Sequence, residues 1–597
     1  MRIESETFIR KCESQSSLRA KMLKAMLKRR PGGVRLGGAH LVVAFAVSLL
    51  ILCLHVGVLA QTRGDERAVY TNPVIAGDFP DPSVIRVGTD YWAMTTTGTW
   101  APHFPILHSR DLVNWRVVGY VFEKSPAWVK SDFWAPEITH DRGRFLVYYT
   151  ARREEGRGKT GTLCVAVASA KSPVGPYTDH GALVCEIPEL KNVGSIDGFF
   201  IRDEKNVPYL IWKADGNDAE PDVPTSIFAQ RLTEDGTRLV GKRKEILRND
   251  AAWERHVVEG SFILKRGRWF YHFYSGNACC GRGCDYALGV ARSRRLLGKW
   301  EKSPKNPIVD DNSDWQCPGH GSIVSTPDGR DFLLYHSYRR RRDTFNVGRE
   351  ALLDEIRWNA DGWPEINAGR GPTSLAASPH GIDEADDEAE FFDDFKEPRL
   401  GLEWQWPMFF EQTLRVDTAT GHLVLESSRS GLMDEWTAAV AARRILSGNY
   451  VATTLVSLAR DARASSSEAR ATAPDARAAS TPSFSMRAGL SAYSWRDRSI
   501  GIAVGRGKVS VWRREGRETR TLAVEDAPAG ARSVYLRMTA KDGELYRFAY
   551  SADGRDWKEL GEAVDGSFIE GAHVALTAGG APGSPARFDW FRLSPNR

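Results

Sequence analysis

The feature that most constrains the fold is a repeat of about sixty residues between positions 78 and 370. Each unit has a special polar residue, a short apolar strand, a polar turn and an aromatic-rich strand, as in "SVIRVGTDYWAMTTT". A third strand and an edge segment follow, as in "CVAVASAKSPVGPY". Helical repeats are disfavoured, because the segments are β-branched and aromatic with Gly-containing turns. The repeat predicts the blades of a five-bladed β-propeller, in which each blade buries its faces against its neighbours.

One polar residue opens each of the five units, and successive openings lie 56, 60, 62 and 61 residues apart. The five are Asp81, Glu137, Asp197, Glu259 and His320. Equivalent positions at the start of the innermost strands converge on one mouth of a propeller. Four carboxylates gathered there repel one another unless function requires them. We therefore expect a functional site at this mouth.

Three acids around a channel suit glycoside hydrolysis, in which one carboxylate activates water and a protonated acid donates to the leaving oxygen. The blades of Asp81 and Glu259 are not neighbours in a ring of five, so the two carboxyl groups lie across the mouth from each other. That geometry is compatible with the separation of roughly 6.5–9.5 Å that an inverting reaction needs. A catalytically inert propeller that binds carbohydrate is the alternative from another class.

The segments "NPVIAGDFPDPSVIR", "FWAPEI", "SIDGFF", "VVEGSFI" and "GREALLDEIRW" resemble glycoside hydrolase family 43 in order and spacing. This family contains five-bladed β-xylosidases, α-L-arabinofuranosidases and arabinanases. The resemblance covers residues 70–370 and implies that Asp81 is the general base and Glu259 the general acid. It also implies that Asp197 orients the acid and modulates its pKa, and that Arg349 contacts substrate. The expected function is release of arabinose or xylose from hemicellulose or arabinan oligosaccharides.

Several further residues are candidate contacts for the carbohydrate. Glu137 and "EGSF" differ from the His and "EGPH" typical of xylosidase members, so the pentose stays open and Glu137 is interpreted as a polar wall or substrate contact. Trp134 and Phe79 are expected to line the same pocket. His320 is interpreted as a hydrogen-bonding histidine or the neighbour of a structural calcium ion, and no cofactor is expected to be required. A fructan or sucrose hydrolase is disfavoured, because that group opens with an Asn-Asp-Pro-Asn type motif and this chain has "FPDPS".

The chain is expected to contain two folded domains after its N-terminal segment. Residues 66–372 form the predicted propeller, and residues 373–390 form an acidic linker. Apolar and polar residues alternate over residues 391–597 as in the strands of a jelly-roll β-sandwich. This part of the chain also resembles the concanavalin-like module of many family 43 enzymes. An Ala/Ser/Arg-rich insert near 459–482 predicts a disordered loop. This second domain could bind polysaccharide or shape the pocket, but a packing role is favoured because it shows no convergent polar site.

The N-terminal segment, residues 1–60, predicts export. An apolar run at 41–60 follows a basic stretch, and "VLAQ" offers cleavage after Ala60. The protein would then be periplasmic or extracellular, or membrane-anchored if the run stays uncleaved. Residues 1–60 carry a net charge of +7, and the rest of the chain carries −2. The part after residue 60 is therefore not basic, and its charge does not favour binding to nucleic acid. The oligomeric state is left open.

Six cysteines remain after the N-terminal segment, at 164, 185, 279, 280, 284 and 317. An even number in an exported protein predicts disulfides. The run "ACCGRGC" could suggest a metal knuckle, but no second Cys or His pair lies at zinc spacing, so bridged loops are favoured over zinc. The pairing is left open.

Overall fold

A computed structural model describes nine segments of the chain: residues 68–154, 161–218, 225–381, 390–408, 412–427, 435–457, 486–494, 498–580 and 585–596. The predicted export segment 1–60, the insert near 459–482 and positions 382–389 of the predicted linker lie outside the described residues. No helix in the described segments is both long and apolar enough to cross a membrane.

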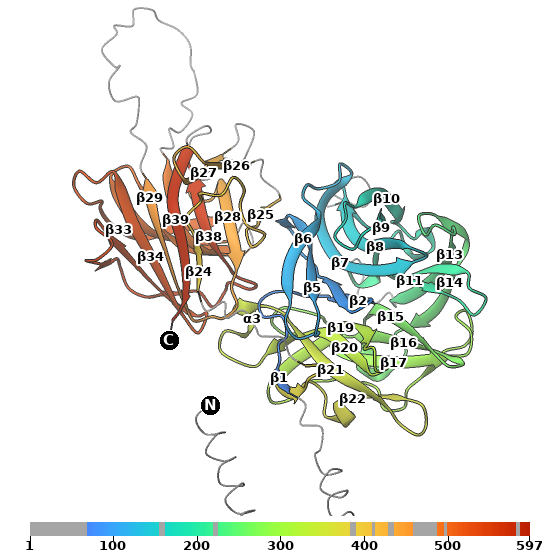
Figure 1. Ribbon diagram of the computed structural model, residues 1–597. Helices are drawn as coiled ribbons and strands as arrows, with labels where there is room; N and C mark the ends of the chain where they lie inside the picture. The colour runs from blue at the N-terminus through green and yellow to red at the C-terminus, as the bar shows by residue number, and fades with distance from the viewer. Residues whose placement is uncertain are drawn as a thin grey trace, which may run out of the picture. The chain divides into compact units, whose positions relative to one another are not determined.

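Five four-stranded antiparallel sheets follow one another along the first half of the chain (Figure 1). Strands pair in sequence order within each sheet, so each sheet is a meander. The strands of blades I to V are β2 (Ser83–Val87), β3 (Asp90–Met94), β5 (His103–Ser109) and β6 (Arg116–Phe122); β7 (Val129–Asp141), β8 (Arg144–Arg153), β9 (Thr162–Ala170) and β10 (Thr178–Val184); β11 (Ser195–Arg202), β12 (Pro208–Ala214), β13 (Ser226–Leu232) and β14 (Leu239–Arg248); β15 (Val258–Arg266), β16 (Trp269–Gly276), β17 (Ala287–Ser293) and β18 (Glu301–Lys302); β19 (Trp315–Ser325), β20 (Asp331–Arg339), β21 (Glu350–Trp358) and β22 (Pro364–Ile366).

Five separate hydrophobic clusters hold the ring together, each between two neighbouring blades, including blades V and I. Strand β8 shows how the sequence achieves this. Leu146 and Tyr148 belong to the cluster shared with blade III, whereas Val147 and Tyr149 belong to the cluster shared with blade I. Successive side chains of a strand point to opposite faces, so an unbroken apolar run fills both interfaces at once. The five-bladed propeller is therefore confirmed.

The ends of the propeller sequence close the ring by an extra pair of strands. Strand β1 (Val69–Thr71) pairs with β23 (Leu375–Ala377), which follows blade V. The Asn72 side chain donates to the Leu353 carbonyl at 3.0 Å and accepts from its N–H at 2.9 Å. These bonds attach the chain to β21 shortly before it reaches the first predicted acid.

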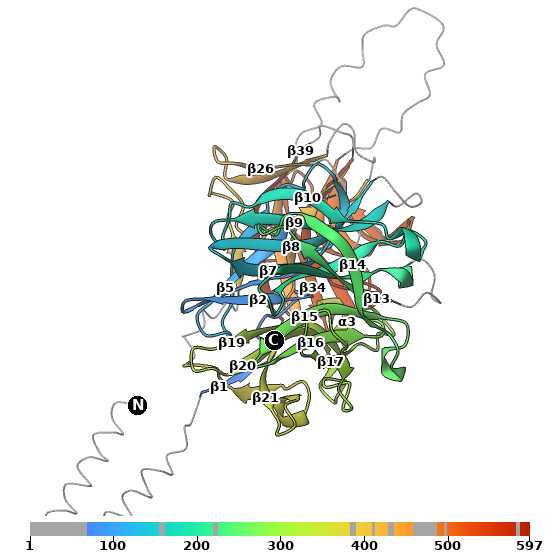
Figure 2. The same ribbon diagram turned by 90° about the vertical axis from the view of Figure 1, so that its right-hand side faces the viewer.

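The C-terminal part is a β-sandwich with a single large hydrophobic cluster between its sheets, as predicted (Figure 2 shows the molecule from the side). One sheet contains β26 (Gln412–Asp417), β27 (His422–Ser427), β39 (Pro585–Pro595), β29 (Tyr450–Ser457), β34 (Ser533–Lys541), β35 (Leu545–Ser551) and β36 (Lys558–Glu559), with β24 (Phe391–Asp393) on β39 and β37 (Val564–Asp565) on β35. The other contains β28 (Ala439–Arg444), β38 (His573–Gly579), β30 (Arg487–Tyr493), β31 (Arg498–Gly505), β32 (Lys508–Glu515) and β33 (Glu518–Asp526).

The remaining elements are short connections. They are β4 (Trp100–Ala101), which pairs with β25 (Trp406–Pro407), the α-helix α3 (Thr344–Val347), and the 3-10 turns η1 (Pro188–Leu190), η2 (Gly216–Asp218), η3 (Ala252–Glu254) and η4 (Asn367–Gly369). All six cysteines after the N-terminal segment form disulfides, which confirms the predicted bridged loops: Cys164–Cys185, Cys279–Cys280 and Cys284–Cys317.

Candidate active site

The predicted acids meet where the first strands of the five blades surround the propeller axis. These strands contact one another in a closed ring: β2 with β7, β7 with β11, β11 with β15, β15 with β19, and β19 with β2. Asp81 lies two residues before β2, Asp197 on β11, and Glu259 on β15. The predicted convergence of acids from distant positions in the sequence is therefore confirmed.

The chain has a residue with left-handed backbone in or just before each of these strands. The backbone is left-handed at Asp81 (φ 54°), Ala135 (φ 44°), Asp197 (φ 58°), Gly260 (φ 61°) and His320 (φ 44°). In β7, β11, β15 and β19 this residue lies at a break in the strand register, as in a β-bulge. Non-glycine residues adopt this conformation at a cost, and they concentrate at functional sites.

The bulges correct the prediction that the five opening residues are strictly equivalent. Asp81, Asp197 and His320 occupy the left-handed position of their blades. Glu259 lies one residue before it, and Glu137 lies two residues after Ala135. The sequence pattern marks the level of the ring, but a bulge changes which residue of the strand is turned, and this shift depends on backbone conformation.

Asp81 is buried and surrounded by cations and hydrogen-bond donors. Its carboxylate accepts a hydrogen bond from the Thr96 hydroxyl at 2.7 Å, and the Arg349 guanidinium lies 3.3 Å away. His320 Nδ1 lies 3.5 Å from the same carboxylate. Burial raises the pKa of Asp81, whereas the Arg349 guanidinium lowers it, and the net result is a pKa below the usual range. Asp81 is therefore ionised at neutral pH, as a general base must be.

His336 of β20 positions the Asp81 backbone. The Asp81 N–H donates to His336 Nδ1 at 3.1 Å. A ring nitrogen that accepts a hydrogen bond carries no proton. Nδ1 therefore does not also donate to the Asp81 carboxylate, although it lies 3.3 Å from Asp81 Oδ1. Burial lowers the pKa of His336 to about 4. His336 is thus neutral, and the positive charge beside Asp81 comes from Arg349.

Asp197 is joined to the strand that carries Glu259. Its backbone N–H donates to the Thr150 hydroxyl of the preceding blade at 3.0 Å. Its carboxylate accepts from the N–H of Gly260, the residue after Glu259, also at 3.0 Å. Burial, opposed by His320 and reinforced by Glu259, raises the pKa of Asp197 to about 6. Asp197 therefore both holds the β15 bulge and places a titratable carboxyl next to Glu259.

Glu259 is held at both carboxyl oxygens. Lys213 Nζ lies 2.5 Å from Oε2, and the Tyr286 hydroxyl donates to Oε1 at 3.0 Å. Lys213 is buried and also lies 3.2 Å from Asp215. Burial lowers the pKa of Lys213, but Glu259 and Asp215 raise it more, so the amine stays charged. These contacts fix the orientation of the Glu259 carboxyl.

Arg349 and His320, the other predicted polar contacts, lie among the acids. Arg349 is fixed from behind, because its backbone N–H donates to Asp78 at 2.9 Å and its carbonyl accepts from Phe79 N–H at 2.9 Å. The His320 N–H donates to the Ser275 hydroxyl at 2.8 Å. Within the described segments no group of three or more His, Cys, Asp or Glu side chains is arranged to hold a metal ion, and calcium near His320 stays a prediction.

Glu137 and Trp134 both lie on β7 beside this ring. Glu137 is half-buried, and burial raises the pKa of Glu137 well above its usual range. Its carboxyl makes no hydrogen bond or ion pair with the described residues. Trp134 is half-buried and is the strand partner of Thr150, whose hydroxyl binds the Asp197 backbone. Both positions suit the predicted role in the wall of the site.

The position of Phe79 differs from the prediction that it lines the pocket. Its ring is buried in the cluster between blades V and I, with Ile75 and Val84. The Arg444 guanidinium of the sandwich lies over the ring, 4.5 Å from its centroid. Phe79 also lines a cavity of about 290 Å³ that none of the predicted acids lines. Pro80 lies between Phe79 and Asp81 and restricts the backbone there, so nearness in sequence does not bring the phenyl ring to the acids.

Four residues of the site were not predicted: Thr96, Lys213, Tyr286 and His336. Each lies near the end of a second strand or in a loop, where the repeat shows no distinctive residue type. The signal for Lys213 is a charged residue in the apolar strand "PYLIWKA", because a lysine there is buried only with a partner. The signal for His336 is similar, a histidine within "DFLLYHS".

The fold and the acids define a class, the propeller glycosidases. Comparison with known proteins gives the family: residues 70–364 match glycosyl hydrolases family 43, and residues 476–594 match the β-xylosidase C-terminal concanavalin A-like domain. The chain belongs to family 43 and is a glycosidase.

Similar proteins share both domains. The chain is 27% identical to "Xylosidase/arabinosidase 43B" of Humicola insolens, over 88% of this chain and 97% of that protein. It is 25% identical to a "Beta-xylosidase" of Bacillus subtilis, over 87% and 99%. The crystal structure of the family 43 protein BlXynB from Bacillus licheniformis superposes with a TM-score of 0.71 at 25% identity, covering 88% of this chain and all of that one.

Proposed function

We propose that this protein is an inverting glycosidase that releases arabinose or xylose units from hemicellulose or arabinan oligosaccharides. The observation that carries the proposal is that two carboxyl groups from different blades meet at one mouth, each held by its own partners. Asp81 is kept ionised beside Arg349, whereas Glu259 is held separately by Lys213 and Tyr286 on blade IV. Two carboxyl groups in different environments suit the roles of base and acid.

The reaction follows from these positions. Asp81 removes a proton from a water molecule, and the water oxygen forms a bond to the anomeric carbon of the sugar. The bond between that carbon and the glycosidic oxygen breaks, and Glu259, which reacts in its protonated form, gives its proton to the leaving oxygen. Asp197 orients the Glu259 strand through the Gly260 N–H. Arg349 contacts the sugar and keeps Asp81 deprotonated.

Both pentoses are proposed because one relative is named for xylosidase and arabinosidase activity and another for β-xylosidase activity alone. Side-by-side assays with p-nitrophenyl α-L-arabinofuranoside, p-nitrophenyl β-D-xyloside and linear arabinan test it. We expect turnover of at least one aryl pentoside, and NMR of the first product should show an inverted anomer. A retained anomer would contradict the water-activating role of Asp81, and no turnover of any of the three would contradict the function.

We further propose that the protein acts outside the cytoplasm, without a required cofactor. The three disulfides support this location, since disulfides persist in oxidising compartments. N-terminal sequencing of the protein recovered from periplasm and medium should begin after Ala60, whereas recovery of the intact chain with membranes would indicate an uncleaved anchor. Activity measured after EDTA treatment and after added calcium tests whether an ion near His320 is needed.

A further inference from the structure

One of the three disulfides has no role as a cross-link between distant parts of the chain. Cys164–Cys185 and Cys284–Cys317 join residues 21 and 33 positions apart. Cys279–Cys280 joins direct neighbours. A disulfide stabilises a protein mainly by closing a loop in the unfolded chain, and neighbouring residues enclose no loop. Its presence therefore calls for a local explanation at the place where it lies.

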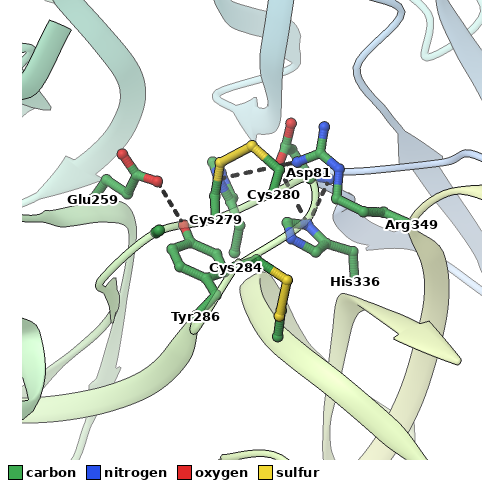
Figure 3. The surroundings of a disulfide bond; sticks show 12 residues. Asp81, Glu259, Cys279, Cys280, Cys284, Tyr286, His336 and Arg349 are labelled. Atoms are coloured by element: carbon green, nitrogen blue, oxygen red, sulfur yellow. Dashed lines mark hydrogen bonds and ion pairs between the residues drawn. A yellow bond between two sulfur atoms is a disulfide. The ribbon is translucent and has the colours of Figure 1, made fainter. Parts of the chain in front are cut away.

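That place is the mouth of the propeller, beside the acid on blade IV. The disulfide lies in the loop between β16 and β17, and this loop starts two residues after Ser275, the strand partner of Glu259. The loop ends at Tyr286, whose hydroxyl donates to Glu259. Figure 3 shows the disulfide with Glu259 on one side and with Asp81 and Arg349 on the other.

The loop is held rigidly without the Cys279–Cys280 bond. Cys284 is bonded to Cys317 on β19, the strand that carries His320. The Gly281 N–H donates to the Tyr338 hydroxyl at 3.1 Å. On the other side, Arg282 donates to the carbonyl of Ser567 in the sandwich. These contacts fix the position of the loop, and the neighbouring disulfide adds no further attachment.

The disulfide differs chemically from the groups around it. Cys279 is half-buried against the cluster of Tyr286, Cys317 and Tyr338, and Cys280 is exposed. The two sulfurs carry no charge and no strong hydrogen-bond donor, whereas Asp81, Glu259 and Arg349 are charged or acidic. A pentose has hydroxyl groups for such partners and also carbon-bound hydrogens, which need an apolar, polarisable surface.

We propose that the Cys279–Cys280 disulfide forms a rigid apolar contact for the pentosyl unit bound between Asp81 and Glu259, and that it determines affinity for that unit. The inference rests on the proposed function. Because the contact is made to the sugar itself, its loss should weaken binding of the free pentose product as much as binding of the substrate. It should not depend on which leaving group the substrate carries.

The test compares Cys279→Ser/Cys280→Ser with the matched control Cys164→Ala/Cys185→Ala, which removes a disulfide that closes a loop. For the serine pair we expect the inhibition constants of free xylose or arabinose, and KM for the preferred aryl pentoside and for a disaccharide, to rise about tenfold with little change in Tm. For the control we expect Tm to fall, with KM and inhibition constants unchanged in the folded protein.

A second variant separates the apolar contact from effects on loop folding. Cys279→Ala/Cys280→Met restores an apolar sulfur without a disulfide, and it should recover part of the lost affinity for the free pentose. Unchanged inhibition constants in the serine pair, or a loss confined to the disaccharide, would overturn the proposal. If the wild-type protein hydrolyses no pentoside, the proposed function fails and this inference fails with it.

Discussion

The propeller and the sandwich are both all-β, but they place their apolar side chains in opposite ways. The sandwich buries one continuous cluster between two sheets, so its centre is filled by hydrocarbon. The propeller divides its apolar residues among five clusters between blades, and Asp81, Asp197 and Glu259 lie at or near the starts of its inner strands. The radial arrangement leaves the starts of the inner strands for charged groups, which a two-layer sandwich core cannot accommodate.

The sandwich nevertheless contacts the segment that presents the base. Arg444 lies over the Phe79 ring, and a side chain at Gly77 (φ 95°) would lie 2.8 Å from the Ile445 carbonyl. The Gly571 N–H donates to the Phe345 carbonyl at 2.8 Å, shortly before Arg349. The difference between the regions is therefore a division of roles: chemistry at the propeller axis, and support of two of its segments by the sandwich.

The strongest test of this division removes the carboxyl groups. We expect Asp81→Asn and Glu259→Gln each to lower kcat by about 10³-fold or more, because each removes a proton-transfer group. Circular dichroism should be unchanged, since both replacements keep side-chain size. Asp526→Asn on exposed strand β33 is the matched control and should retain full activity. Retained turnover in either propeller variant would end the assignment of base and acid.

The second test compares two lysine–carboxylate pairs. Lys213→Met should lower kcat about 10²-fold, because Glu259 loses its fixed orientation. It should also cost about 3–5 kcal/mol of unfolding free energy, since Asp215 and Glu259 are left without their buried cation. Lys508→Met breaks the exposed pair with Asp526 and should change neither quantity measurably. Urea unfolding and steady-state kinetics measure both effects, and equal results for the two variants would contradict the assigned role of Lys213.

The sequence allowed the ring of acids to be predicted because each blade contributes one inner strand at a regular interval. Asp81, Asp197 and His320 follow that interval and occupy equivalent left-handed positions. The interval cannot show the one-residue offset of Glu259, because an offset of this kind arises from the backbone conformation at a bulge. The sequence predicts Phe79 in the wall of the pocket, but its ring is buried in the core between blades V and I.

The residues that support the acids were harder to predict, since they come from other strands. Lys213 reaches Glu259 from the preceding blade, and His336 reaches Asp81 from blade V. Their contacts depend on how neighbouring blades pack, and the local sequence around each residue does not specify this packing. Disulfides were predicted from the even number of cysteines, whereas the pairing of Cys279 with Cys280 became visible only in the structure.

The third test compares core packing in the two regions. Leu536→Ala in the sandwich and Leu334→Ala in the propeller should each cost about 2–5 kcal/mol of unfolding free energy, because both side chains are fully buried. Only Leu334→Ala should also lower kcat/KM, by several-fold, since Leu334 lies two residues before His336 on β20. Kinetics at a temperature where both variants are folded would show the difference. An equal loss of kcat/KM in the sandwich variant would mean that its core is coupled to the site.

The smallest expected effect is a change in pH dependence. Arg349 lowers the pKa of Asp81, so Arg349→Met should raise that pKa by about one unit or more. Because Asp81 must be deprotonated to act, the acidic limb of kcat/KM should move to higher pH by the same amount, in addition to any loss of substrate binding. Arg444→Met removes a buried guanidinium from the sandwich and should leave the acidic limb in place. If the acidic limb moved by the same amount in both variants, the local pairing with Arg349 would not explain the low pKa of Asp81. Charges from both regions would then set that pKa.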